Sequence, residues 1–146
     1  MEIRPIELGD KSEWLRMRTA LWPESPEDHE PEIVEFFTQE SPIAAIFVAD
    51  RPDGRLAGFV ECGSRAYAEG CLSSPVGYIE GWWVDRDVRG QGVGALLVSA
   101  AEDWARSQGY AEMASDADLN NEVSQLAHRA LGYDETQRVV CYRKQL

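Results

Sequence analysis

The stretch Arg89-Gly90-Gln91-Gly92-Val93-Gly94 follows an apolar, aromatic segment and stands directly before a helical pattern. From Val93 to Trp104, apolar residues recur at offsets of 3, 4, 7, 8 and 11, which predicts an amphipathic helix. Glycines adopt positive φ and let the backbone approach a ligand closely, and the first turn of a helix leaves several N–H groups unpaired. Together with the helix dipole, these N–H groups predict an anion site suited to a pyrophosphate.

Two familiar phosphate-binding motifs do not fit this stretch. A P-loop requires Gly-Lys-Ser/Thr, whereas Gly94 is followed by Ala95 and Leu96. A dinucleotide fingerprint requires G-x-G-x-x-G, whereas the spacing here is G-x-G-x-G, and only 52 residues follow Gly94 to complete the sheet. A plain glycine-rich turn is a third alternative, but it explains neither the arginine nor the three glycines.

The pattern Arg89-x-x-Gly92-x-Gly94 after an apolar strand resembles the acetyl-CoA motif of the GNAT acetyltransferase superfamily at every fixed position. That resemblance implies that the pyrophosphate binds at the helix start and that the pantetheine pairs with the backbone of the preceding strand. The residues implied for acetyl-CoA are Trp82, Trp83, Val84, Arg89, Gly90, Gln91, Gly92, Val93, Gly94, Ala95 and Asn121.

A second motif of the superfamily has its spacing preserved as Asn121-x-x-Ser124-x-x-x-His128-x-x-x-Gly132-Tyr133. His128 stands where many members carry a tyrosine that protonates the departing thiolate. A histidine can donate that proton, so the resemblance implies a catalytic role, and a packed or solvated histidine is the alternative.

Beyond these motifs, the chain resembles the aminoglycoside 6′-N-acetyltransferases nearly from end to end. The pieces that carry this resemblance are Leu21-Trp22-Pro23, Tyr67 with Cys71-x-Ser73-Ser74-Pro75, Glu80-Gly81, Glu112-Met113-Ala114-Ser115-Asp116 and Tyr142-Arg143-Lys144. The resemblance implies an aminoglycoside site that includes Trp22, Tyr67, Glu80 and Asp116. Relatives use an acid near the start of the last strand, where this chain has Gln137, and neighbouring Glu135 is the alternative contact.

Glu80 and Asp116 are also candidates on physical grounds. Glu80 lies on the strand that leads into the glycine-rich turn, and Asp116 ends the expected neighbouring strand. Either carboxylate would take a proton from the acceptor ammonium before direct attack on the acetyl carbonyl. A backbone N–H of Trp83 or Val84 would stabilise the developing oxyanion. An exposed or capping carboxylate is the alternative for each acid.

The charge of the chain favours a cationic acceptor. Fourteen basic and 26 acidic side chains give a net charge of −12, which excludes nucleic acid and anionic membranes as natural partners. Residues 20–50 and 107–128 contain no Lys or Arg and hold many of the carboxylates. A solvated acidic surface is the alternative interpretation. An N-acetyltransferase acting on another polyamine or a protein amine, and a non-catalytic acetyl-CoA-binding module, both remain open.

The pattern of elements predicts one α/β (α+β) domain over residues 1–146. We expect the GNAT fold, a mixed, mostly antiparallel sheet of six to seven strands, flanked by four helices and splayed at the acetyl-CoA site. Asp10 and Glu13 predict a capping box at the first helix. The expected strands cover residues 2–8, 43–49, 56–62, 76–84, 110–115 and 133–142, and the second helix covers residues 26–40.

Three scattered cysteines, Cys62, Cys71 and Cys141, predict reduced thiols in the cytoplasm and no metal site. The N-terminus lacks the pattern of a secretory signal, and no apolar run approaches the length of a membrane span. The expected partners are an aminoglycoside and a second copy of the chain, with residues 138–143 as candidates for pairing across a homodimer.

Overall fold

The computed structural model describes residues 1–146, which form one five-stranded sheet with four α-helices. The strands are β1 (Ile3–Pro5), β2 (Ala45–Asp50), β3 (Leu56–Arg65), β4 (Val76–Val84) and β5 (Met113–Ser115). The helices are α1 (Lys11–Leu21), α2 (Pro26–Phe37), α3 (Val93–Ser107) and α4 (Glu122–Ala130), with short 3-10 turns η1 (Leu8–Asp10) and η2 (Arg86–Val88). The spatial order is β1-β2-β3-β4-β5, and only β5 runs parallel to its neighbour. The expected mixed, mostly antiparallel sheet and the four helices are confirmed.

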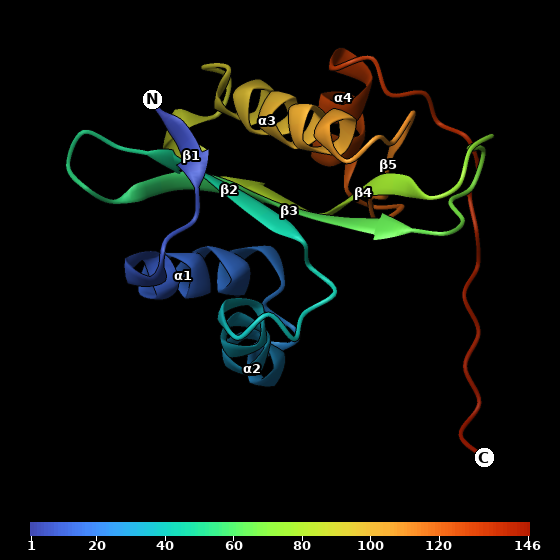
Figure 1. The fold of residues 1–146 in the computed structure, drawn as a ribbon, viewed down its shortest axis with the longest axis horizontal. Helices are drawn as coiled ribbons and strands as arrows, with labels where there is room; N and C mark the ends of the chain where they lie inside the picture. The colour runs from blue at the N-terminus through green and yellow to red at the C-terminus, as the bar shows by residue number, and fades with distance from the viewer.

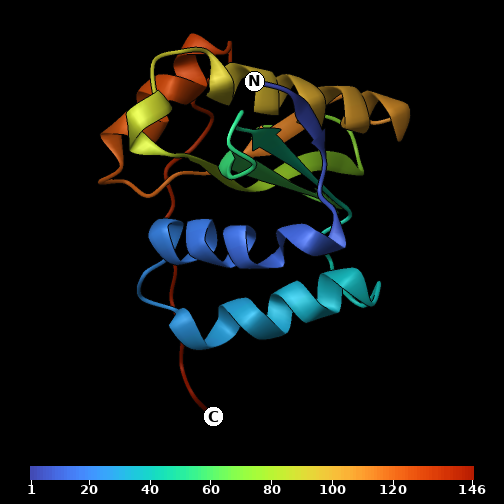
Figure 2. The same ribbon diagram turned by 90° about the vertical axis from the view of Figure 1, so that its left-hand side faces the viewer.

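The sheet separates two helical layers, with α1 and α2 on one face and α3 and α4 on the other (Figures 1 and 2). Alternating side chains of β3 divide between the layers: Phe59 packs with Trp14 of α1, whereas Val60 packs with Leu97 of α3. The apolar stripe that predicted α3 is therefore the surface that covers the sheet.

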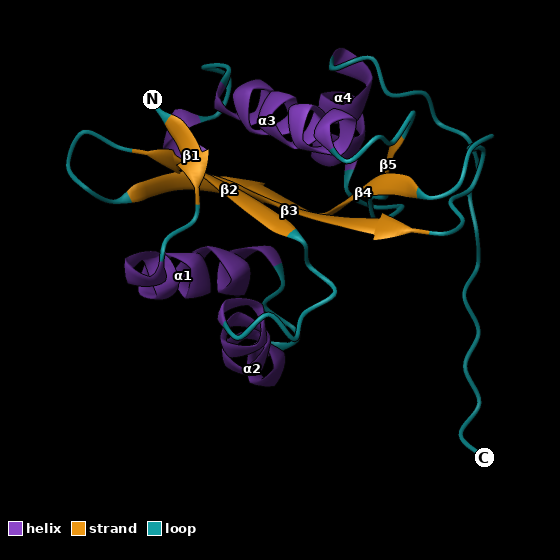
Figure 3. Ribbon diagram, viewed as in Figure 1, coloured by secondary structure: helices purple, strands orange, loops and turns teal.

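The expected strand over residues 133–142 is wrong, and so is the expectation of six to seven strands. Residues 133–146 contain neither helix nor strand; Tyr133 packs against the core, and the end of this tail extends away from the body of the molecule (Figures 1 and 3). Its apolar side chains, including Val140 and Tyr142, are exposed. A strand requires a paired neighbour, and within this chain no strand pairs with the tail.

The capping box expected from Asp10 and Glu13 is also wrong. The Asp10 side chain accepts from the Glu7 N–H at 2.8 Å and pairs with Arg4 at 2.8 Å, so it caps the preceding turn η1 instead of α1. Glu13 pairs with Arg16 within α1. Because a short 3-10 turn precedes α1, the capping signal lies one turn earlier than the apolar pattern suggests.

An irregularity in β4 opens the sheet at its centre. Gly81 lies opposite Glu61 and Ile79 lies opposite Cys62, so Glu80 has no partner on β3 and forms a β-bulge. On the other side, β5 pairs only with Gly77, Tyr78 and Ile79 of β4. Beyond Ile79, one edge of β4 is therefore free, as expected of a sheet that splays.

Candidate active site

The glycine-rich loop leads from β4 into the first turn of α3. Gly90 and Gly92 have φ of 76° and 85°, and no atom lies within 4 Å of the position that a Cβ would take at either residue. The first backbone hydrogen bond of the helix runs from Leu96 N–H to Gly92 O. The N–H groups of Val93, Gly94 and Ala95 therefore have no partner in the chain, and the backbone before them is open to an anion.

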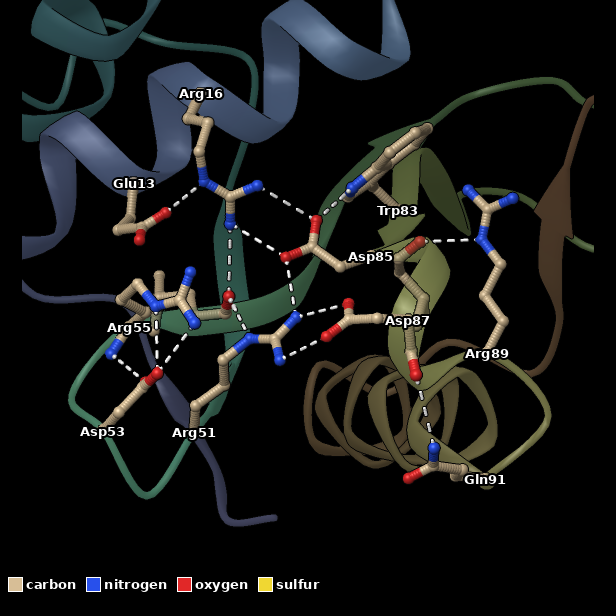
Figure 4. Close-up of polar contacts among 12 residues, drawn as sticks. Glu13, Arg16, Arg51, Asp53, Arg55, Trp83, Asp85, Asp87, Arg89 and Gln91 are labelled. Carbon is tan, nitrogen blue, oxygen red and sulfur yellow. Dashed lines mark hydrogen bonds and ion pairs between the residues drawn. The ribbon is translucent and has the colours of Figure 1, made fainter.

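Arginine side chains hold this loop to the sheet (Figure 4). Arg89 donates to Val84 O at 2.8 Å, and its guanidinium lies 4.8 Å from the centroid of the Trp83 ring. Arg51 binds Asp87 at 2.7 Å and Asp85 at 3.1 Å, and Arg16 binds Asp85 at 3.0 Å. The position of the loop is thus fixed by Arg51 directly after β2, by β4 and by α1 before any ligand arrives.

Asp85 is the centre of this network. Its burial acts to raise the pKa of the carboxyl, but hydrogen bonds from Arg16, Trp83 and Arg51 outweigh burial and lower the pKa. The carboxylate therefore stays ionised, and together with Asp87 and Glu13 it balances the charge of the two guanidinium groups beside the loop.

The hydrogen bonds at the two ends of β4 show which of its N–H groups point to the free edge of the strand. Gly77 N–H donates to Glu112 O beside β5, whereas Asp85 N–H donates to Ala57 O on β3. Because alternate residues of a strand donate to opposite sides, and the bulge shifts this alternation by one residue, the N–H of Val84 faces the free edge while that of Trp83 faces β3. Of the two predicted oxyanion donors, only the N–H of Val84 therefore faces the free edge.

The Trp82 ring lies between the start of α3, after the glycine-rich loop, and α4. A Cβ at Gly94 would approach the Trp82 ring to 3.0 Å, so the glycine allows α3 to pack closely on β4. The buried Trp82 Nε1 has no hydrogen-bond partner, and the ring packs edge-on to His128 at 5.3 Å.

His128 is held by two serines. Its Nδ1 lies 2.7 Å from Ser124 O, which can only accept, so Nδ1 carries the proton. Its Nε2 lies 2.8 Å from the Ser115 hydroxyl at the end of β5. Ser115 thus stands between His128 and the space beside the free edge of β4, where β5 ends.

A cavity of about 530 Å³ lies on the opposite face of the sheet, between α1, α2, β3 and β4. It is lined by five carboxylates and two guanidinium groups: Asp28, Glu32, Glu35, Glu61, Glu80, Arg18 and Arg65. Trp22 also lines it, and the Trp22 ring lies over Gly81, where a Cβ would clash at 2.5 Å. The cavity therefore combines an excess of negative charge with an aromatic wall.

The two predicted acids belong to one chain of contacts at the mouth of this cavity. Both oxygens of Glu80 accept from Arg65, at 3.2 and 2.8 Å. The Arg65 guanidinium lies 3.5 Å from the centroid of the Tyr78 ring, and Tyr78 donates to Asp116 Oδ2 at 2.6 Å. Asp116 Oδ1 has no hydrogen-bond partner in the chain, so one oxygen of that carboxylate is free.

A buried ion pair forms the floor of the cavity. Arg18 donates to Glu61 Oε1 at 2.6 Å, and Trp14 Nε1 donates to the same oxygen at 3.0 Å. Arg18 also pairs with Glu32 and donates to His29 Nδ1 at 3.3 Å. Burial raises the pKa of Glu61 to about 7, against the opposing effects of Arg18 and Trp14.

This pair also supports Trp22. His29 Nε2 lies 2.9 Å from Trp22 O, the two rings stack at 6.3 Å, and the Arg18 guanidinium lies 4.9 Å from the Trp22 ring centroid. The aromatic wall is therefore positioned by charged groups from α1, α2 and β3.

Other predicted acceptor contacts do not line the cavity. Tyr67 is 71% exposed, and Glu135 and Gln137 lie in the exposed tail, where Glu135 pairs with Arg138. Asn121, predicted to contact acetyl-CoA, caps α4 by accepting from Ser124 N–H at 3.1 Å.

Sequence reasoning missed Arg18, Glu61 and Arg65. A signal existed for two of them: Arg18 follows Trp14 at helical spacing on the apolar stripe of α1, and Glu61 is the one charge in the strand pattern Leu56–Cys62. A charge at a core position implies a buried partner. Arg65 carried no such signal, because it ends a strand next to a polar loop.

No helix has the length and apolarity needed to cross a membrane, and no group of three or more His, Cys, Asp or Glu side chains could hold a metal ion.

The profile of the acetyltransferase (GNAT) family matches residues 13–133, which include the glycine-rich loop, the bulged strand and α4. The chain therefore belongs to this family. It is 46% identical over 146 residues to an aminoglycoside N(6')-acetyltransferase type 1 of Klebsiella aerogenes, with 99% of this chain and 96% of that protein covered.

Solved structures agree with this similarity. The crystal structure of the aminoglycoside 6'-N-acetyltransferase AAC(6')-IG from Acinetobacter haemolyticus, without ligand, has a TM-score of 0.90 at 34% identity, covering 100% of this chain and 99% of the other. AAC(6')-Iy in complex with the bisubstrate analog CoA-S-monomethyl-acetylneamine has a TM-score of 0.89 at 37% identity, covering 99% and 98%.

Proposed function

We propose that this chain transfers an acetyl group from acetyl-CoA to the 6′-amine of an aminoglycoside antibiotic and so confers resistance. The observation that carries the proposal is the acidic, tryptophan-walled cavity at the bulge of β4, on the opposite face of the sheet from the anion-binding loop. A polycationic ring system fits this cavity by charge and by shape. The name of the Klebsiella relative and the bisubstrate analog bound to AAC(6')-Iy support the same acceptor class.

The residues present fit coenzyme A. The free N–H groups of Val93, Gly94 and Ala95 would bind the pyrophosphate, and the free edge of β4 at Trp82 and Val84 would pair with the pantetheine. When bound there, the thioester supplies an activated acetyl carbonyl to the gap beside β4.

Asp116 is the proposed general base. Tyr78 orients this carboxylate through Oδ2, and the unpaired Oδ1 is the oxygen that can accept the proton of the acceptor ammonium. Glu80 would hold the ammonium in place, whereas Val84 lies four residues further along β4, about 13 Å away, and its N–H serves the pantetheine. Binding both substrates against one bulged strand also removes much of the entropic barrier to attack.

Ser115 and His128 are proposed to return a proton to the departing sulfur. After His128 has taken a second proton from solvent, its Nε2 donates to Ser115 Oγ while the Ser115 hydroxyl proton passes to the sulfur, which leaves both side chains neutral. The role expected of His128 as an acid is retained, but the serine is the group that meets the sulfur.

Release of free thiol from acetyl-CoA tests the function. We expect rapid release with aminoglycosides that carry a 6′-amine, little with spermidine or lysine peptides, and none with a 6′-hydroxyl aminoglycoside. Faster release with peptides would favour a protein acetyltransferase. Binding of acetyl-CoA without release for any amine would favour a binding module. NMR of the product would identify the acetylated nitrogen.

A variant that lacks all three cysteines is expected to keep full activity. Burial raises the pKa of the Cys62 thiol to about 12 and also raises that of Cys71, so neither is a ready nucleophile, and Cys141 lies in the exposed tail. Near-complete loss of kcat in any single Cys→Ala variant would contradict direct transfer. The free thiols also support a cytoplasmic location.

The exposed tail supports a homodimer. Thr136 is hydrogen-bonded to Glu69 O at 3.0 Å, after which the chain leaves the body with Val140 and Tyr142 exposed. The outer edge of β5 is unpaired. We place the tail of one copy, residues 138–143, against the sheet of another, since both surfaces lack a partner within one chain.

Light scattering of the intact chain and of a chain ending at Gln137 tests this assembly. We expect a dimer for the first and a monomer for the second. A Lys144→Ala variant, which leaves the apolar tail residues in place, is the control and should remain dimeric. A dimer that survives truncation would place the interface elsewhere.

A further inference from the structure

The mouth of the acidic cavity already contains a cation. The Arg65 guanidinium binds both Glu80 oxygens and lies over the face of Tyr78, whose hydroxyl binds Asp116. One carboxylate that binds through both oxygens, together with an aromatic face, forms a site that suits an ammonium group. In the free chain, the side chain of Arg65 fills that site.

The position of Arg65 allows its side chain to move out of this site. It is the last residue of β3, adjoins the loop over residues 66–75, and its side chain is 43% exposed. The pair is bidentate and the guanidinium stacks on Tyr78, but at this exposure water screens both contacts, so turning the guanidinium into solvent costs far less than breaking a buried pair. By contrast, the cation on the cavity floor, Arg18, is 3% exposed and bound by Glu61, Glu32 and His29.

We propose that Arg65 is a built-in competitor that occupies the acceptor's ammonium subsite between Glu80 and Tyr78, and that the acceptor binds by displacing it. The inference rests on the proposed acetylation of a polycation and identifies a residue that sets how tightly acceptors bind.

Acceptors differ in how far they offset the displacement of Arg65, according to the number of ammonium groups they carry. An acceptor with one ammonium group only replaces the charge that Arg65 already supplies. An acceptor with several ammonium groups also gains contacts with Asp28, Glu32 and Glu35 on the far wall of the cavity. Arg65 therefore lowers the affinity for every acceptor by the same factor, and only an acceptor with several ammonium groups offsets that loss through the other carboxylates of the cavity.

The test compares Arg65→Gln with Arg106→Gln, which removes the same charge from an exposed pair with Asp103 on α3. Calorimetric titration without acetyl-CoA would measure the Kd of neamine, of spermine and of glucosamine. For Arg65→Gln we expect about two- to fivefold tighter binding of each, by a similar factor for all three. Arg106→Gln should match the unmodified chain, and the Kd of acetyl-CoA should not change in either.

Weaker or unchanged binding in Arg65→Gln would overturn the proposal, because it would make Arg65 a positioning residue for Glu80 or a bystander. Arg65→Lys, which retains the charge but loses the double contact, should lie between the two forms. Spermine separates this inference from the proposed function. Tighter spermine binding with no aminoglycoside acetylation by the unmodified chain would retain the subsite and refute the acceptor.

Discussion

Arg18→Met is expected to lower the free energy of unfolding by about 3–5 kcal/mol. The substitution leaves Glu61, which is 2% exposed, without its charged partner, and it removes the donor that holds His29 beneath Trp22. Urea unfolding would measure the loss. Arg106→Met, which breaks only an exposed pair, should cost less than about 1 kcal/mol.

The loss in Arg18→Met should also depend on pH. In the unmodified chain the pKa of Glu61 lies near 7, above its ordinary value of 4.5, so its contribution to stability falls as pH rises between these values. Without Arg18 the pKa rises further. We therefore expect a smaller loss at about pH 5.5, where Glu61 is protonated, than at about pH 8.

A double variant, Arg18→Met with Glu61→Leu, identifies the cause of that loss. It should be more stable than Arg18→Met alone, because it removes the buried charge instead of stranding it. A double variant that is less stable than either single variant would show that packing of these side chains, and not charge pairing, stabilises the cavity floor.

Asp116→Asn is expected to lower kcat/KM for the aminoglycoside by about a hundredfold, because an amide cannot accept the proton of the attacking ammonium. The Tyr78 hydroxyl can still donate to the remaining oxygen, so the fold should be unaffected. Steady-state kinetics over a range of pH would show whether the loss lies in kcat, as expected of a base.

Asp103→Asn removes a carboxylate of similar charge from the exposed surface of α3 and is the matched control. A rise confined to the acceptor KM in Asp116→Asn would make this residue an ammonium-binding carboxylate and would leave Glu80 as the remaining candidate base. Unchanged turnover would remove Asp116 from the site.

The glycine-rich loop and α3 were predictable because both depend on local signals. The helical period from Val93 to Trp104 and the positions of Gly90 and Gly92 correspond to the observed helix and to its positive-φ approach. The tail was not predictable in the same way. Its β-branched residues match a strand pattern, but a strand forms only where a partner edge exists, and no pattern within the tail reports on that edge.

The acceptor site was only partly predictable from sequence. Trp22 and Glu80 lie at the cavity, while Asp116 is linked to it through Tyr78 and Arg65. The bulge at Glu80 could not be read from the strand pattern, because it arises from the pairing of β4 with β3. The link between Glu80 and Asp116 depends on contacts across β3, β4 and β5, which no short-range pattern encodes.

The placement of α1 and α2 on one face of the sheet and of the glycine-rich loop and α3 on the other has an evolutionary consequence. Mutations in α1 and α2 can change the recognition of the drug without altering the glycine-rich loop and α3, which bind the acyl donor. Under changing antibiotic selection, substitutions on α1 and α2 can thus alter the range of accepted drugs step by step. Substitutions in the bulged strand β4, which contacts both substrates, should be tolerated least.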